Sequence, residues 1–184
     1  MTFSSPRRRG SSLTQCTHDG ASTPPSEAAP EHALSGWAPG WPAGVRGSIT
    51  HCPGYAAAAV GPLRRISAIG IDAEPDMPLP DGVLDLVATP AEHDHLAAIQ
   101  PEPDSPNWDR LLFSAKEAVY KTWFPLVGEW LDHHEAQIHF HPQDRTFTAR
   151  LSRDGLIING HHIRRLHGQW AHKQGILVTA VVLD

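Results

Sequence analysis

Apolar residues recur at helical spacing over one long stretch of the chain, from about residue 107 to residue 123. This pattern predicts a helix with one core-facing stripe, and Pro125 is expected to close it because proline disfavours helix in the residue before it. The predicted stripe consists of Trp108, Leu111, Leu112, Ala115, Val119 and Thr122. Lys116, Glu117, Tyr120 and Lys121 are placed on the other side of the helix.

Alternation with a period of two predicts strands in the rest of the chain. Residues 66–74 form the clearest case, because Asp72 and Glu74 fall on one face, about 7 Å apart by strand geometry. Residues 55–60 fit either a buried strand or a short helix, and Thr89-Pro90 starts a short helix with Thr89 as its N-cap. Further strands are predicted at 137–140, 147–151, 156–158, 161–165, 168–172 and 176–183. The fold class is therefore α+β, with a mostly antiparallel C-terminal sheet.

The first 36 residues differ in composition from the rest of the chain. They are rich in Ser, Thr, Pro, Gly and Ala and have almost no large apolar side chains. Such a segment cannot bury enough surface to offset the entropy cost of folding, so residues 1–36 are predicted to be disordered or unrelated. Residues 37–184 are predicted to be one folded domain.

Charge and cysteine content exclude several classes of partner. A formal net charge of -5 gives no basic footprint for nucleic acid or an anionic membrane. No apolar run reaches the roughly 18 residues that span a bilayer. The two cysteines, Cys16 and Cys52, lie in different surroundings and are interpreted as free thiols in a reducing cytoplasm.

The acidic and basic residues of two predicted elements suggest phosphoryl transfer. Asp72 and Glu74 beside Gly70 suit a hard cation such as Mg²⁺, although an isolated D-x-E is more often a solvated strand end. Glu117 and Lys121 are neighbours on a helix, and alone they would be interpreted as an exposed ion pair. Three acids for a metal and lysines for a phosphate together are what phosphoryl transfer requires. The histidines at 133–134, 139, 141 and 161–162 are interpreted as mostly exposed, without a second metal site.

Three motifs in order resemble those of a known family. Gly70-Ile71-Asp72-Ala73-Glu74 and Phe113-Ser114-Ala115-Lys116-Glu117-Ala118-Val119-Tyr120-Lys121 resemble the paired signature G-[IV]-D-x-E and [WF]-[SC]-x-K-E-[AS]-x-x-K of the 4'-phosphopantetheinyl transferases. Trp41-Pro42 followed by Gly47-Ser48-Ile49-Thr50-His51-Cys52 resembles an upstream motif of that family. The likeness runs from about Trp41 to the C-terminus and is closest to the monomeric, EntD-like and Sfp-like branch of actinobacterial type.

This resemblance implies a fold of two similar α/β halves, the first of them incomplete here. It implies Mg²⁺-dependent transfer of 4'-phosphopantetheine from coenzyme A to a serine of an apo carrier protein, with release of 3',5'-ADP. The carrier could be an acyl, peptidyl or aryl carrier domain of siderophore, non-ribosomal peptide, polyketide or fatty-acid biosynthesis. The enzyme is expected to be a cytoplasmic monomer.

The resemblance also assigns roles to residues. Asp72, Glu74 and Glu117 would ligate Mg²⁺, and Glu117 or a water that it positions would deprotonate the carrier serine. Lys116 and Lys121 would contact phosphate oxygens during transfer. His51 would bind the 3'-phosphate of coenzyme A, with Ser48 and Thr50 shaping that loop.

The segment before Trp41 departs from the family pattern. Residues 31–40 read EHALSGWAPG, without the lysines of the family's K-G-x-x-G-x-P sequence. Either the reading frame begins upstream, or coenzyme A binding is weakened. A non-catalytic protein that binds carrier protein or coenzyme A is therefore the alternative, and a metal-dependent phosphate-ester hydrolase is a weaker one.

Overall fold

The computed structural model describes residues 40–184 except 101, 153–155 and 159. The predicted disordered or unrelated segment 1–36 lies outside the described residues, as do Cys16 and most of the segment 31–40. Cys52 has a free thiol, as predicted. None of the helices in the described ranges is long and apolar enough to cross a membrane.

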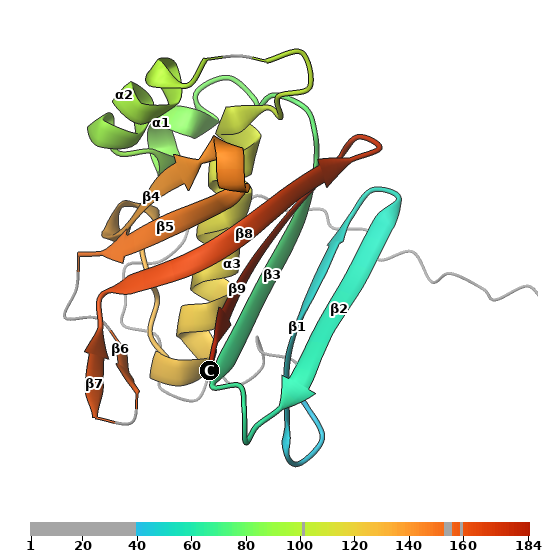
Figure 1. The fold of residues 1–184 in the computed structure, drawn as a ribbon, viewed down its shortest axis with the longest axis vertical. Coiled ribbons are helices and arrows are strands. Elements are labelled where there is room, and N and C mark those ends of the chain that lie inside the picture. Colours follow the sequence, from blue (N-terminus) through green and yellow to red (C-terminus); the bar gives the residue numbers. More distant parts are fainter. Residues whose placement is uncertain (1–39, 101, 153–155, 159) are drawn as a thin grey trace, which may run out of the picture. The chain divides into compact units, whose positions relative to one another are not determined.

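Within the described ranges, the chain forms one long helix, two short helices and nine strands, arranged as in Figure 1. The helices are α1 (Val83–Val87), α2 (Pro90–Ala98) and α3 (Trp108–Val127). The strands are β1 (Val45–Cys52), β2 (Tyr55–Pro62), β3 (Ala68–Pro75), β4 (Ala136–His141), β5 (Thr146–Leu151), β6 (Leu156–Ile158), β7 (His161–Ile163), β8 (Arg165–Lys173) and β9 (Ile176–Leu183). Two 3-10 turns, His133–Glu135 and Pro142–Asp144, flank β4. The mixed α+β class is confirmed.

Five strands form the main sheet in the order β3-β9-β8-β5-β4, and every neighbouring pair is antiparallel. The hairpin β1–β2 lies beside β3, the edge strand, so the ambiguous segment 55–60 is a strand (Figure 1). The expectation of two similar halves concerns the chain before residue 40 as well, and it stays a prediction.

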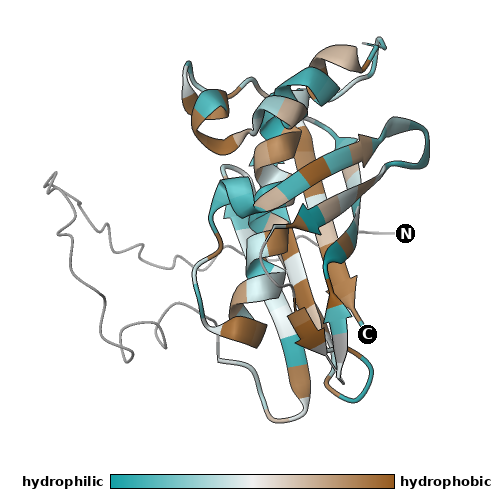
Figure 2. Ribbon diagram, turned by 90° about the vertical axis from the view of Figure 1, so that its left-hand side faces the viewer, coloured by the Kyte–Doolittle hydropathy of each residue, from teal (hydrophilic) through white to brown (hydrophobic). Residues whose placement is uncertain are grey.

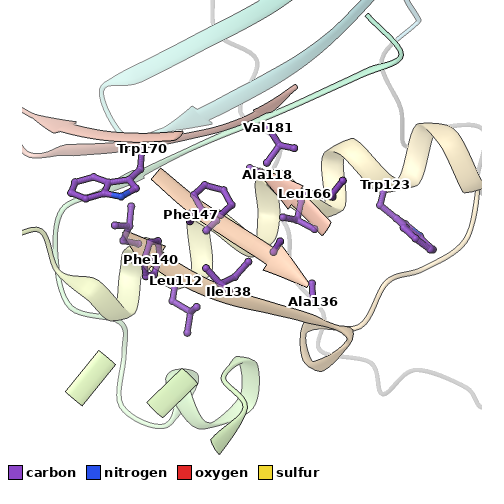
Figure 3. Packing of buried hydrophobic residues seen from close by; sticks show 14 of the residues in the cluster. Leu112, Ala118, Trp123, Ala136, Ile138, Phe140, Phe147, Leu166, Trp170 and Val181 are labelled. Carbon is purple, nitrogen blue, oxygen red and sulfur yellow. The ribbon is translucent and has the colours of Figure 1, made fainter. Parts of the chain in front are cut away.

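The core lies between α3 and one face of the sheet. Apolar and polar residues alternate along the strands (Figure 2). The apolar side chains of β4, β5 and β8 belong to the same buried cluster as those of α3. Phe140 and Phe147 pack there with Leu112, Ile138 and Leu166 (Figure 3). Helix packing against an antiparallel sheet thus buries the stripe that the helical spacing predicted.

Two helix ends show how local chemistry sets the boundaries. Thr89 caps α2 in a full capping box with Glu92, and Pro90 is the first helical residue, as predicted. Pro125 does not end α3, contrary to the prediction. The helix continues to Val127 and ends at Gly128 in the left-handed conformation, because a proline one turn from the end forfeits only one hydrogen bond.

Candidate active site

Helix α3 approaches β3 closely at Gly70. A side chain at this position would collide with the carbonyl oxygen of Ala118 and with Thr122, so only glycine permits this contact. Residues two and four positions further along the strand, Asp72 and Glu74, share the face of Gly70 and therefore also point toward the helix.

Three charged residues of α3 lie opposite these two acids. Arg110, Glu117 and Lys121 are seven and four residues apart, which places them on one side of the helix. The Lys121 ammonium donates to Asp72 Oδ1 at 2.7 Å, and Arg110 Nη1 donates to Glu74 Oε2 at 3.0 Å. We call Asp72, Glu74, Arg110, Glu117 and Lys121 the β3–α3 charge cluster.

Asp72 is the most enclosed member of this cluster, with 4% of its surface exposed. Its Oδ1 accepts from Lys121 and, at 3.3 Å, from the hydroxyl of Thr50. Its Oδ2 is buried and has no hydrogen-bond partner among the described residues. Because an unmet buried acceptor costs about 1–3 kcal/mol, this oxygen is well suited to receive a cation or a donor from a ligand.

The carboxylates of the cluster affect one another's protonation. Burial, and then the negative charge of Asp72, raises the pKa of Glu117 above its ordinary value, while Lys121 opposes this shift. Burial and Asp72 also raise the pKa of Glu74, which Arg110 partly offsets. The same two effects, burial and then the charges of Glu74 and Asp72, raise the pKa of the nearby Cys52 thiol. A divalent cation would relieve this crowding of negative charge.

The donors present match Mg²⁺ in kind, since that ion prefers carboxylate oxygens and water. The described residues nevertheless hold no group of three or more His, Cys, Asp or Glu side chains already at metal-binding spacing. The reason is visible in the ion pairs, because Glu74 points toward Arg110 and Asp72 Oδ1 toward Lys121. Asp72, Glu74 and Glu117 therefore lie in one cluster, but their carboxylates are not arranged as a complete set of metal ligands.

The hairpin strand β1 supports this site from the other side of β3. The hydroxyls of Ser48 and Thr50 accept hydrogen bonds from the backbone N–H groups of Ile71 at 3.0 Å and Ala73 at 2.9 Å. Both side chains are buried, so they fasten a strand rather than shape a loop. His51 points to the opposite, exposed face of β1, and the structure does not bring it together with them.

Lys116 lies away from the charge cluster, which differs from its predicted place on the polar side of α3. It is 2% exposed, and its ammonium donates to Glu92 at 2.9 Å and to the carbonyl oxygens of His133 at 2.6 Å and Ala136 at 3.0 Å. An ammonium has three protons, and these acceptors use all of them. Burial lowers the pKa of Lys116, and the adjacent Glu92 opposes that shift.

A cavity of about 430 Å³ adjoins the cluster between the hairpin and α3. Glu117 and Lys121 line it together with Ser48 and Arg46, and the rest of its wall is mainly aromatic and apolar. The aromatic members are Trp41, Tyr120, Phe124 and Trp130. A mixed wall of this kind, with a few charged groups at one end, is typical of small-molecule sites.

Sequence reasoning missed two residues with clear roles. Arg110 neutralises Glu74, and its spacing of seven residues from Glu117 was a usable signal. Glu92 is the partner of Lys116. The Thr-x-x-Glu capping pattern that begins at Thr89 predicted that the Glu92 side chain bonds the backbone at the start of α2 and does not extend into solvent.

Models of two protein families match this chain. Residues 68–174 match the model of the 4'-phosphopantetheinyl transferase superfamily, and residues 16–61 match that of the 4'-phosphopantetheinyl transferase N-terminal domain. The motif likeness begins at about Trp41, whereas the match to the N-terminal domain model already begins at residue 16. It overlaps the segment 1–36, whose assignment as disordered or unrelated stays a prediction.

Three curated relatives are similar over most of this chain. It is 47% identical over 146 residues to the 4'-phosphopantetheinyl transferase Svp of Streptomyces mobaraensis, covering 79% of this chain and 59% of that protein. It is 44% identical to PptT of Mycobacterium tuberculosis (79% of this chain, 65% of the relative) and 43% identical to Npt of Nocardia iowensis (78% and 67%). The chain thus spans about three fifths to two thirds of the length of these relatives. With both family models and three relatives in agreement, the chain belongs to the 4'-phosphopantetheinyl transferase superfamily.

Proposed function

We propose that this protein transfers the 4'-phosphopantetheine group of coenzyme A to a serine of an apo carrier protein in a Mg²⁺-dependent reaction that releases 3',5'-ADP. The β3–α3 charge cluster supplies the groups that such a transfer uses, and the adjoining cavity is large enough for part of a cofactor-sized molecule. We further propose that the protein acts as a cytoplasmic monomer on carriers of siderophore, peptide, polyketide or fatty-acid synthesis.

The observation that carries this proposal is the buried Oδ2 of Asp72, which lacks a partner among the described residues. Its sister oxygen is held by Lys121 and Thr50, so the carboxylate is fixed with one oxygen left for a ligand. A carboxylate that served only to stabilise the fold would be expected to have both oxygens satisfied.

Asp72, Glu74 and Glu117 are the residues that would hold Mg²⁺. To ligate the metal, Glu74 would give up its ion pair with Arg110. When bound, the ion would neutralise charge on the phosphates of the substrate.

Glu117 is the proposed proton acceptor, directly or through a water. It lines the cavity, and its raised pKa makes it a better base than an exposed carboxylate. Lys121 also lines the cavity and is the proposed contact to the phosphate oxygens, as a compact positive charge.

The remaining predicted site residues have other proposed roles. Lys116 is a positioning residue that fixes α3, because its protons are already donated to protein acceptors. Ser48 and Thr50 hold β1 against β3 and thereby keep the wall of the cavity in place. His51 is exposed and stays a proposed contact for the 3'-phosphate.

The test is the mass of an apo carrier protein incubated with the full chain, coenzyme A and Mg²⁺. A gain equal to one phosphopantetheine group, together with 3',5'-ADP that forms only when carrier is present, is expected. If the mass of no tested carrier increases, the proposed transferase activity of this chain is refuted. Release of phosphopantetheine or phosphate without carrier would support a hydrolase instead.

A matched pair of variants connects the activity to the site. Asp72→Asn keeps the shape of the side chain but weakens its affinity for a cation, so transfer should fall at least a hundredfold. Asp81→Asn makes the same chemical change at an exposed turn and should leave transfer unchanged. Equal activity of both variants would show that the charge cluster is not the active site.

A further inference from the structure

The face of the main sheet that points away from α3 carries a long groove. Ile138 and Phe140 of β4 enter the core (Figure 3). Because side chains alternate along a strand, Gln137 and His139 point to the outer face. Two hollows of about 720 and 350 Å³ lie on this outer face. Both are lined by Ala91, Gln137, Arg150 and Arg165, so they form one continuous groove.

The groove is positively charged, although the whole chain is negative with a net charge of -5. None of the residues that line the two hollows is an aspartate or a glutamate. Arg150 and Arg165 face each other directly across the β5–β8 pair. Both are exposed, and neither has an ion pair among the described residues. Like charges directly opposite each other destabilise a sheet, so this pair favours an anionic ligand between or above the two side chains.

Histidines extend the groove beyond the arginine pair. The rings of His95 and His139 stack with centroids 3.9 Å apart, and His139 lies 5.1 Å from His141. His95 Nε2 accepts the backbone N–H of Phe140 at 2.9 Å, which favours its neutral form. The two arginines therefore supply the permanent charge, and the histidines supply hydrogen-bonding groups along the rest of the groove.

We infer that this groove binds an acidic segment of a partner protein. Its positive and polar groups are spread over three strands and one helix rather than directed at one point. A small anion such as phosphate is best held by donors that converge, whereas spaced carboxylates of a polypeptide match a groove of this length. The groove is separate from the β3–α3 charge cluster, since β4, β5 and β8 carry it on the face opposite α3.

Fluorescence anisotropy of the full chain with a labelled glutamate-rich peptide tests this inference. The expected result is binding at low salt that weakens at least tenfold between 20 and 200 mM salt, because exposed charge pairs are screened. The same peptide with glutamine in place of glutamate should not bind. Equal affinity for both peptides overturns the inference.

Two double variants locate the binding surface. Arg150→Gln with Arg165→Gln should lower the affinity for the acidic peptide at least tenfold. Arg64→Gln with Arg65→Gln removes the same charge from an exposed turn outside the groove and should change it less than twofold. Equal losses would mean non-specific attraction and refute the site. Binding of inorganic phosphate, but not of the peptide, would also overturn the proposal, and circular dichroism verifies that all variants fold.

Discussion

Removal of either partner of the buried ion pair between Lys116 and Glu92 should be one of the most destabilising single changes in this fold. Each side chain is about 1% exposed, and the ammonium–carboxylate distance is 2.9 Å. Glu92 also accepts the backbone N–H of Ile138 at 2.7 Å and that of Thr89 at 2.7 Å. Together with the carbonyls that Lys116 contacts, the pair therefore joins α2, α3 and β4.

Removing one partner leaves the other charge buried and unpaired, which typically costs about 3–5 kcal/mol. Lys116→Met keeps nearly the same volume, so we expect its free energy of unfolding to fall by about that amount. Glu92→Gln should have a loss of similar size, because its amide N–H groups would face the Lys116 ammonium and the Thr89 N–H. The double variant removes both charges, and its loss should be smaller than the sum of the two single losses by about 0.5–3 kcal/mol or more.

Urea unfolding followed by far-ultraviolet circular dichroism measures these differences. Lys173→Met, at the exposed last residue of β8, is the matched control and should change stability by no more than about 0.5 kcal/mol. A loss below about 1 kcal/mol for Lys116→Met would refute the reasoning. Additive losses in the double variant would show that the two side chains do not interact energetically.

Three further predictions concern packing, hydrogen bonding and pH. Gly70→Ala should destabilise the protein by several kcal/mol and lower the yield of folded protein, because the new methyl group meets the backbone carbonyl of Ala118. Ser48→Ala should lower the free energy of unfolding by about 1–3 kcal/mol, because the Ile71 N–H loses its acceptor. Burial lowers the pKa of His95, so the unfolded state binds more protons and stability should be full above about pH 6.5 and fall as the pH decreases below it. In His95→Asn, that decrease should be shallower.

Each of these predictions has its own control. Urea unfolding of Gly40→Ala, a site with open space around it, should show no change, and a stable Gly70→Ala protein would contradict the close approach. His51→Ala removes an exposed side chain of the same strand as Ser48, and a loss equal to that of Ser48→Ala would mean that the hydroxyl is not the cause. An identical pH profile in the wild type and His95→Asn would assign the decrease to other groups, such as His133, whose pKa is lowered by burial and by Lys116.

Much of the fold followed from local signals. Helical spacing predicted α3, alternation predicted the C-terminal strands, and Thr89-Pro90 predicted the start of α2, because each of these depends on residues close together in the sequence. Pro125 was misinterpreted, since the cost of a proline depends on how many turns remain after it. The run at 55–60 stayed ambiguous until its pairing with β1 was known, because small apolar residues fit both structures.

The site was predictable where its residues face one another across β3 and α3, and not where partners come from elsewhere. Asp72 and Lys121 were expected at the same site, and they form an ion pair. The burial of Lys116 depends on Glu92, which is 24 residues away and in another helix, so its helical position alone could not reveal the contact. The orientation of His51 likewise depends on which face of β1 meets β3.

The hydroxyls of Ser48 and Thr50 have a consequence for solubility. β3 is the edge strand of the five-stranded sheet, and a bare edge of that kind can recruit a strand from another molecule. By accepting the outward N–H groups of Ile71 and Ala73, the two side chains occupy the positions that an invading strand would need. Replacing both hydroxyls would therefore leave the edge of β3 open to pairing with a strand of another molecule, which promotes aggregation. β1 thus protects this edge in addition to lining the cavity.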